Sequence, residues 1–408
     1  MKKKVFLLHG RVGKSILIDF DYISKFEGMD IYLVTNKQVS YWLDANGIAK
    51  FFSKIICCDN DTCFESITSE ITSNIDIGTT DFYIVTLSES RVELCGRLNN
   101  HFGLNSIDYN LFVNKRWMKE NISPLGICTP KFIVIDFDRY RKSKEHYINN
   151  IIKEIGLPIF IKPLNMFGAM ETSKINSNSE LESWFNDNKN SSLTFEADEF
   201  LDGELFHCES ITINGEVKLC HVFKYSTPCF NTYLGENLGS ISLLSSEPDF
   251  IKISHMSSII THEFLKSGSG VTHLEVFKVR GQYYFLEIAY RPPGILASDV
   301  YLKLYKLPLR EWHILSQVGF SFDTPELNFH VARLLIPYPI KPGRLEGISK
   351  PRILSKYKFN WNCEIGDNLP VNQGIDEYAG TMLIWNKDLQ QLKSDFKAIC
   401  QHDFLTVI

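Results

Sequence analysis

The sequence predicts an α/β fold in which a Rossmann-like N-terminal domain precedes domains of mixed α+β structure. Short apolar runs alternate with helix-like stretches over the first hundred residues, and strand signals dominate from 157 to 290. In addition, a chain of 408 residues is too long for one ordinary core. At roughly 150 residues per domain, it is expected to divide into two or three domains.

The N-terminal strands are expected at short runs of β-branched and aromatic residues. Continuous apolar runs of this length, separated by helix-like stretches, are typical of parallel strands that helices join. The alternation therefore indicates a Rossmann-like opening. The runs cover residues 5–10, 31–35, 54–59 and 82–87.

The pattern changes after the first hundred residues. A basic amphipathic helix is expected within 114–126, because this segment ends with a proline and a glycine, and the strand 131–136 follows it. Strands continue beyond about residue 330, and a final helix is expected over 386–400. Because no repeat or low-complexity linker separates these parts, the domains are expected to pack on one another.

Two dipeptides are the strongest hairpin signals in the chain. Asp202-Gly203 and Asn214-Gly215 both suit the left-handed backbone of a tight turn between antiparallel strands. We therefore expect a hairpin at each of them.

The composition limits the classes of partner. The chain has 43 Lys and Arg against 48 Asp and Glu, for a net charge of −5, which argues against a nucleic-acid coat and against binding to an anionic membrane. Its 10 cysteines are too sparse for a disulfide framework. The apolar run 5–8 is too short for a secretory signal, and no window resembles a membrane span. A cytoplasmic protein that binds a small ligand is expected.

The segment 9–15, HGRVGKS, only partly matches a phosphate-binding P-loop. Such a loop needs a glycine five residues before Gly13, where this chain has Leu8. Gly10 and Gly13 are instead expected to let the chain turn out of the first strand, with Lys14 in solvent.

Two glutamates lie on neighbouring expected strands, at Glu275 in 272–279 and at Glu287 in 282–291. Because side chains alternate along a strand, a two-residue loop would put the carboxylates on opposite faces of the sheet. A three-residue loop that ends in left-handed Gly281 would put them on one face, and we expect this odd-length loop. Mg²⁺ takes one or two carboxylates together with phosphate oxygens, so the pair predicts a magnesium site.

Lysines supply the other half of such a site. Lys162 lies inside the apolar strand PIFIKP (158–163), where an unpaired ammonium is costly unless it meets an anion, and Lys224 lies in the similar segment HVFKYS (221–226). The segment 164–175, which follows the strand of Lys162, is expected to be a loop between two strands. Gly168 would let its backbone approach a phosphate closely. The alternative for each lysine is a surface position in which the aliphatic stem is buried and the ammonium reaches solvent.

Six segments occur in an order that resembles the ATP-grasp superfamily, and most closely its carboxylate–amine ligases, which include D-alanine:D-alanine ligase and the bacterial L-amino acid ligases. The resemblance covers roughly residues 110–295, behind a compatible Rossmann-like domain. The segments are NKRWM (114–118), PIFIKP (158–163), ADEFLDGELFHCESITINGEV (197–217), FKY (223–225), GVTHLEVF (270–277) and YYFLEIAYRPPG (283–294).

The resemblance implies a domain division and a nucleotide site. The domains are a Rossmann-like domain (1–112), two ATP-grasp subdomains that clasp ATP (113–197 and 198–330), and a small C-terminal α+β extension (331–408). Lys115 and Lys162 would contact the phosphates, Glu204 the ribose, and Lys224 the terminal phosphate. The adenine would meet the hinge formed by Asp198, Glu199, Phe200 and Leu201.

The resemblance also assigns the reacting centre. Glu275 and Glu287 would hold Mg²⁺, with Mn²⁺ as a substitute, and His273 and Arg291 would stabilise the oxyanion or acyl phosphate. Glu236 would face a substrate ammonium. Substrate contacts are also expected from His207, Arg291 and Gly294.

The implied activity is ATP-dependent formation of an amide bond between L-amino acids through an acyl phosphate. Two departures from the family pattern bear on it. Ala289 stands where many relatives have an asparagine, and Ala169 and Met170 make the phosphate loop poor in glycine. A carboxylase, a phosphotransferase and a non-catalytic nucleotide-binding protein are the alternatives. Relatives are often dimers, so a homodimer is compatible with the resemblance.

Overall fold

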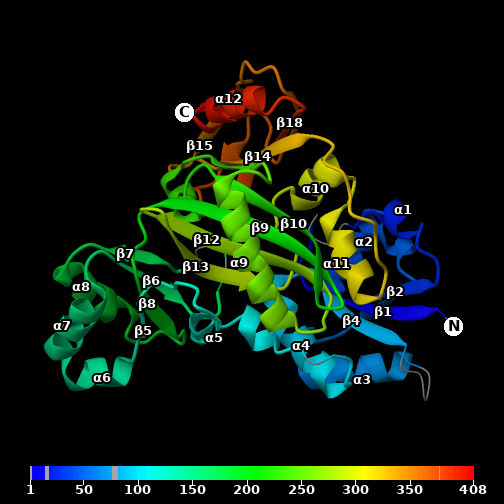
Figure 1. The fold of residues 1–408 in the computed structure, drawn as a ribbon, viewed down its shortest axis with the longest axis horizontal. Coiled ribbons are helices and arrows are strands. Elements are labelled where there is room, and N and C mark those ends of the chain that lie inside the picture. The colour runs from blue at the N-terminus through cyan, green and yellow to red at the C-terminus, as the bar shows by residue number, and fades with distance from the viewer. Residues whose placement is uncertain are drawn as a thin grey trace.

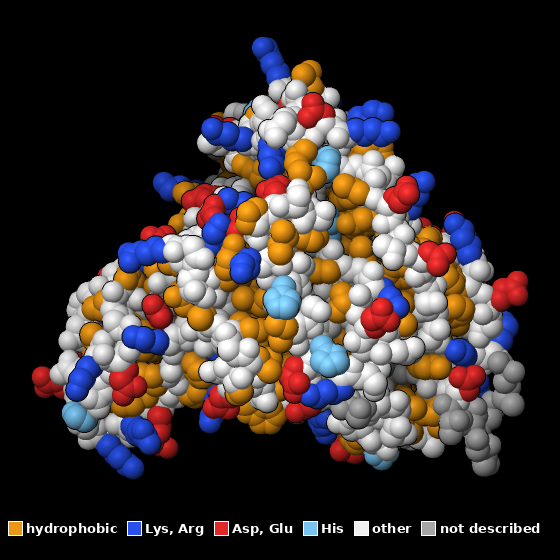
Figure 2. Space-filling view, in the orientation of Figure 1, with side chains coloured by type: hydrophobic (Ala, Val, Ile, Leu, Met, Phe, Trp, Pro, Cys, Tyr) orange, Lys and Arg blue, Asp and Glu red, His pale blue; other side chains and the backbone are white. Residues whose placement is uncertain are grey.

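The structure is a computed structural model that describes residues 2–13, 18–75, 81–105, 107–166, 168, 170–375 and 377–408. Lys14 and Ala169 lie outside the described residues. Within these ranges, no helix combines the length and the apolar character needed to cross a bilayer. On the face shown in Figure 2, lysine and arginine side chains are interspersed with aspartate and glutamate.

The N-terminal part forms a parallel sheet with strand order β3-β2-β1-β4. Apolar strands buried against helices on both faces are what parallel sheets require, so the Rossmann-like prediction is confirmed. The strands are β1 (Lys3–Leu8), β2 (Met29–Thr35), β3 (Lys54–Cys57) and β4 (Phe82–Thr86), and the helices are α1 (Phe20–Ile23), α2 (Lys37–Ala45), α3 (Phe64–Asn74) and α4 (Val92–His101).

The second sheet is antiparallel, with strand order β5-β8-β6-β7, and lies at the opposite end of the molecule from β1 (Figure 1). Helix α5 (Lys115–Ile122), where the amphipathic helix was expected, precedes this sheet, and three helices share its apolar core. The strands are β5 (Phe132–Val134), β6 (Ile159–Pro163), β7 (Ser173–Ile175) and β8 (Phe195–Glu199), and the covering helices are α6 (Phe137–Lys142), α7 (Lys144–Ile155) and α8 (Asn178–Asn188).

A long antiparallel sheet forms the centre of the molecule, with strand order β13-β12-β9-β10-β11-β14-β18-β16. Its strands are β9 (Glu204–Ile213), β10 (Glu216–Tyr225), β11 (Leu238–Ser242), β12 (Gly270–Val279), β13 (Gln282–Ala289), β14 (His330–Pro337), β16 (Lys356–Trp361) and β18 (Tyr378–Asn386). The expected domain boundary between 330 and 331 falls within β14, inside this sheet.

The two faces of the long sheet are covered by different helices, and side chains of β9 alternate between them. Phe206 and Cys208 share a core with α9 (Pro248–Leu265), which crosses the sheet in Figure 1. Ile211 instead packs with α10 (Ala297–Tyr305) and α11 (Leu309–Gln317). The period-two alternation of a strand therefore aims every second residue of β9 at the face that α9 leaves free.

The C-terminal residues add a small antiparallel sheet of order β17-β15-β19, made of β15 (Gly343–Ile348), β17 (Asn368–Leu369) and β19 (Leu405–Val407). Helix α12 (Leu389–Cys400) begins at Asp388, whose carboxylate accepts hydrogen bonds from the backbone of residues 390 and 391. This confirms the expected final helix.

The two hairpin predictions have different outcomes. Asn214-Gly215 joins β9 to β10 as a hairpin, with φ of 51° and 79°. The hairpin expected at Asp202-Gly203 is wrong, because the chain there passes from the second sheet to the long sheet. The glycine is needed for another reason: a Cβ on Gly203 would lie 2.3 Å from the carbonyl oxygen of Lys278.

His313 on α11 makes folding sensitive to acid. Its Nδ1 accepts the backbone N–H of Val271 at 2.9 Å, and burial lowers its pKa to about 3. An unfolded histidine takes up its proton near pH 6.5, so below that pH protonation favours the unfolded chain until the folded imidazole also titrates. Between pH 7 and pH 5 this group should lower the free energy of unfolding by about 2 kcal/mol.

Urea unfolding at the two pH values checks this prediction. His313→Gln should lose that share of the pH dependence, whereas His255→Gln, at an exposed position of α9, should keep it. Equal pH dependence in His313→Gln and the parent chain would contradict the assignment.

Candidate active site

A cavity of about 320 Å³ lies between the second sheet and the long sheet. It brings together most of the residues that the sequence nominated: Lys115, Lys162, Asp198, Glu199, Phe200, Leu201, His273, Glu275, Glu287, Arg291 and Gly294. The other four candidates are not among the described residues that line this cavity. They are Glu204, His207, Lys224 and Glu236.

The two glutamates face the same cavity, but the loop that joins their strands differs from the expected one. The loop has two residues, Arg280 and Gly281, with φ of 50° and 84°, so the expectation of an odd-length loop is wrong. The register then shifts by one residue, because the partner of Glu275 is Glu287 and the partner of Val276 is Phe285.

Leu286 is therefore the extra residue of a β-bulge. A bulge reverses the alternation of side chains beyond it, so the carboxylates of Glu275 and Glu287 lie directly opposite each other on one face. Phe285, which strict alternation from Glu287 would place on that face, instead packs in the core with Ile288.

Donors and a cation surround the carboxylate pair. Lys115 Nζ lies 3.3 Å from Glu287 Oε2, and the Tyr225 hydroxyl donates to Glu275 Oε1 at 3.0 Å. Burial alone would raise the pKa of Glu287, but the charges of Lys115 and Lys162 outweigh it and hold the pKa below its usual value. Two carboxylates that share a cavity with lysines are a donor set that fits Mg²⁺ bound to a phosphate group.

Lys162 belongs to a buried cluster of four charged side chains. Its Nζ lies 2.9 Å from Asp198 Oδ2 and 3.5 Å from Glu196 Oε1. Lys119 completes the cluster at 2.6 Å from Asp198 Oδ1 and 2.9 Å from Glu196 Oε1. Despite burial, the two carboxylates raise the pKa of Lys162, so its ammonium is charged and fixed before any ligand arrives.

Lys119 and Glu196 were missed at the sequence level, although their spacing gave a signal. Lys119 follows Lys115 by four residues on α5, and Glu196 precedes Asp198 by two residues on β8. Each pair therefore shares a face of its element.

The expected adenine hinge is the connection between the second sheet and the long sheet. Phe200 and Leu201 line the cavity, and Lys174 Nζ lies 4.0 Å from the centre of the Phe200 ring. The Glu199 carboxylate accepts the Lys131 N–H at 3.4 Å. The Asp198 carboxylate is held by Lys119 and Lys162 rather than being free for a ligand.

Glu204 and Lys224 form an ion pair with each other outside the residues that line the cavity. Both side chains are exposed, at 46% and 39%, and Lys278 lies 3.8 Å from the Glu204 carboxylate. This placement leaves both side chains open to solvent and able to rearrange toward a ligand.

Arg291 is paired with a residue that the sequence did not nominate. Its Nε donates to the carboxylate of Glu89 at 2.9 Å, its Nη2 contacts the same oxygen, and its Nη1 donates to the Pro292 carbonyl. Glu89 precedes α4 in the N-terminal domain and also lines a smaller cavity of about 100 Å³, together with Lys115 and Glu287. The N-terminal domain therefore contributes a carboxylate beside the predicted reacting centre.

The remaining candidates, Glu236 and His207, lie outside the residues that line the cavity. Glu236 is exposed and binds Thr227 and Asn231. His207 is buried, and its Nε2 lies 3.5 Å from Nη2 of Arg333. Arg333, from β14, also lines the cavity and donates to the carbonyl oxygens of residues 294 and 295. It falls beyond the segment on which the family resemblance rests.

Part of the chain is similar in sequence to known proteins. Residues 121–227 match the family model described as the D-ala D-ala ligase C-terminus. A curated relative, the L-arginine-specific L-amino acid ligase of Bacillus subtilis, is 26% identical over 261 residues. That match covers 61% of this chain and only 60% of the relative's own length.

Solved structures share the fold over nearly the whole chain. An L-amino acid ligase from Bacillus licheniformis superposes with a TM-score of 0.73 at 14% identity, covering 100% of this chain and 98% of that one. N5-carboxyaminoimidazole synthetase from Staphylococcus aureus, solved with ADP, has a TM-score of 0.66 at 14% identity and covers 98% of both chains. The chain therefore has the ATP-grasp fold that the sequence predicted, and its matched segments resemble the carboxylate–amine ligases of that superfamily.

Proposed function

We propose that this protein is an ATP-dependent ligase that joins two L-amino acids through an acyl phosphate and releases ADP and phosphate. The observation that carries the proposal is the pair Glu275 and Glu287, directly opposite on β12 and β13 in one cavity with Lys115 and Lys162. Carboxylates beside ammonium groups suit the charge of a nucleotide tail and its metal ion.

The nucleotide would lie between the second sheet and the long sheet. In this arrangement Lys115 and Lys162 meet its phosphates, and the hinge that includes Phe200 and Leu201 borders the adenine. Because Glu196 and Asp198 already hold Lys162, its ammonium needs little rearrangement to bind an anion. Glu204 and Lys224 would turn from each other toward the ribose and the terminal phosphate.

Glu275 and Glu287 would hold Mg²⁺, or Mn²⁺ in its place, and that ion would neutralise charge on the phosphate oxygens. Tyr225 and Lys115 would orient the two carboxylates, since each already donates to or pairs with one of them. These contacts keep the acids on the cavity side of the sheet.

In the first half-reaction, a substrate carboxylate oxygen attacks the terminal phosphorus of ATP, and the bond from that phosphorus to ADP breaks. An amine nitrogen then attacks the acyl carbon, the carbon–oxygen bond to phosphate breaks, and the amine loses a proton. Arg291 and His273 line the cavity where the tetrahedral oxyanion would form, and a donor beside a developing charge stabilises it. Glu236 and Glu89 are the carboxylates that would turn toward a substrate ammonium, Glu236 from its contacts with Thr227 and Asn231 and Glu89 from its pair with Arg291.

The proposal is tested by a phosphate-release screen. Pairs of L- and D-amino acids are incubated with the protein, ATP and Mg²⁺, and products are identified by mass spectrometry. The expected result is phosphate release that needs two amino acids and yields a product lighter than their sum by one water. ADP release that depends on bicarbonate, or phosphate transfer without an amide, would replace the proposal with a carboxylase or a phosphotransferase. ATP binding without phosphate release from any pair would indicate a nucleotide-binding protein.

A further inference from the structure

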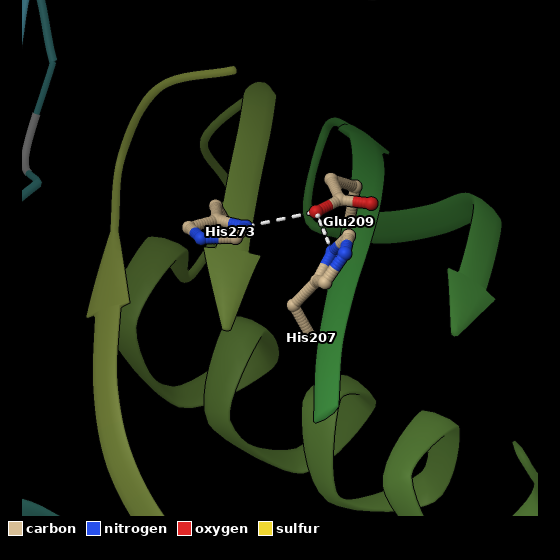
Figure 3. Close-up of side chains that lie close together, drawn as sticks. All are labelled: His207, Glu209 and His273. Atoms are coloured by element: carbon tan, nitrogen blue, oxygen red, sulfur yellow. Dashed lines mark hydrogen bonds and ion pairs between the residues drawn. The ribbon is translucent and has the colours of Figure 1, made fainter. Parts of the chain in front are cut away.

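Two buried histidines, His207 on β9 and His273 on β12, contact the same carboxylate oxygen of buried Glu209 (Figure 3). Glu209 Oε1 lies 2.6 Å from His207 Nδ1 and 2.8 Å from His273 Nδ1, and both rings point toward it. The second oxygen, Oε2, accepts the Tyr301 hydroxyl at 3.1 Å. Glu209 is 1% exposed, so these contacts replace water around its charge.

The surroundings of this trio favour a hydrogen-bond network over a metal site. Two imidazoles and a carboxylate whose ligand atoms lie within 4.8 Å of one another could hold a cation such as zinc. A metal-bound imidazole, however, donates its outer N–H to an acceptor. The outer nitrogen of His207 instead faces the Arg333 guanidinium at 3.5 Å, and that group can only donate.

His207 is the fixed and neutral member of the network. Its ring stacks on Phe223 with centroids 4.8 Å apart and planes 6° from parallel. Burial lowers the pKa of His207, and this effect exceeds the opposing effect of Glu209, so the pKa falls to about 4. Its Nδ1 therefore donates to Glu209, and its Nε2 is left as an acceptor for Arg333.

His273 is the member that connects the network to the cavity. Its Nδ1 faces Glu209, and its Nε2 lies 3.6 Å from Oε1 of Glu275. His273 and Glu275 line the cavity, whereas Glu209 lies behind them. A hydrogen bond at one ring nitrogen sets the rotation of an imidazole and hence the direction of the other nitrogen.

We propose that Glu209 is a positioning residue, which holds the His273 ring with Nε2 directed at Glu275 and the reacting groups, while Tyr301 fixes the Glu209 carboxylate from the other side. The proposal deepens the proposed function and rests on it for its kinetic consequence. The hydrogen bond itself can be measured without any substrate.

Glu209→Gln keeps the size of the side chain but removes the charge, and its amide nitrogen cannot accept from Tyr301. We expect kcat for amide formation to fall by about 10- to 100-fold, by analogy with the loss of a hydrogen-bond partner that orients a metal-bound imidazole. The KM for ATP should change by less than about twofold, because the nucleotide-contacting lysines lie elsewhere. Tyr301→Phe should lower kcat in the same direction by less, and Glu216→Gln, at an exposed acid of β10, should leave it unchanged.

A double-mutant cycle separates positioning from a structural role. If Glu209 acts through His273, Glu209→Gln should lower kcat by less than about twofold when His273→Gln is already present. A full additional loss in the double variant, or a rise in the KM for ATP as large as the fall in kcat, would overturn the proposal.

Nuclear magnetic resonance of the ¹⁵N-histidine-labelled parent protein gives a test that needs neither turnover nor a folded Glu209 variant. At pH 7 the ring-nitrogen shifts of His273, read through its carbon-bound protons and assigned with His273→Gln, should show a proton on Nδ1. An unprotonated Nδ1 would overturn the proposal whatever reaction the screen finds. If no amino-acid pair reacts but Nδ1 carries its proton, the ligase function fails while the contact with Glu209 stands.

Discussion

Glu287→Gln is expected to abolish ADP formation while leaving the fold intact. The change keeps the volume of the side chain but removes one of the two carboxylates that face each other across β12 and β13. It also leaves Lys115, 3.3 Å away, without its counter-ion. Loss of one preorganised electrostatic group at a reacting centre typically lowers kcat by about 10²- to 10³-fold, and loss of a metal ligand should reach at least that size.

The measurement is ADP release with saturating ATP and Mg²⁺, together with a thermal melt of each protein. Glu263→Gln, at an exposed acid near the end of α9, is the matched control and should keep full turnover. Undiminished ADP release by folded Glu287→Gln would reject Glu287 as a metal ligand.

Lys119→Met is expected to have the largest effect on stability. Lys119 and Lys162 balance Glu196 and Asp198 in a cluster where Lys119 and Glu196 have no exposed side-chain surface. Removing one lysine leaves a buried carboxylate without compensation, a change that typically costs about 3–5 kcal/mol. Because Asp198 and Lys162 line the cavity, nucleotide affinity should fall as well.

Urea unfolding at pH 7 measures the effect. Lys119→Met combined with Glu196→Gln restores the balance of charge and should recover part of the lost free energy of unfolding. Lys153→Met, at an exposed position on α7, should change stability by less than about 0.5 kcal/mol. If Lys119→Met has the same free energy of unfolding as the parent protein, the ammonium of Lys119 does not stabilise the cluster.

The N-terminal sheet could be predicted because its strands are buried on both faces and read as continuous apolar runs. Within the described part of the chain, β1, β2, β3 and β4 all fall where those runs lie. The helix α9 was missed in a region assigned mainly to strands. Its buried residues Ile253, Ile260 and Phe264 follow a helical spacing, but the β-branched residues between them favour extended structure, and the serines disfavour a helix interior.

The orientation of the carboxylate pair could not be derived from loop length alone. A single extra residue reverses every side chain beyond it, and the chain contains that residue at Leu286, inside β13, instead of in the turn. The sequence around Leu286 carries no glycine or other local signal for a bulge. The expectation that both acids share a face was correct, whereas its stated cause was wrong.

The partners of Arg291 and His207 show the other limit. Glu89 and Arg291 are 202 positions apart, and Arg333 reaches His207 from 126 positions away. Neither contact has a spacing or period that local reasoning can use. Motifs within one strand or helix could be read from the sequence, but contacts that depend on how domains and distant strands pack could not.

The proposed role of Glu275 and Glu287 is to hold a divalent cation together at the nucleotide phosphates. Its most direct test is diffraction from crystals grown with ADP and Mn²⁺, recorded at the manganese absorption edge. An anomalous peak is expected about 2 Å from a carboxylate oxygen of each glutamate and beside the phosphates. A peak bound to neither glutamate, or one located among His207, Glu209 and His273, would contradict it.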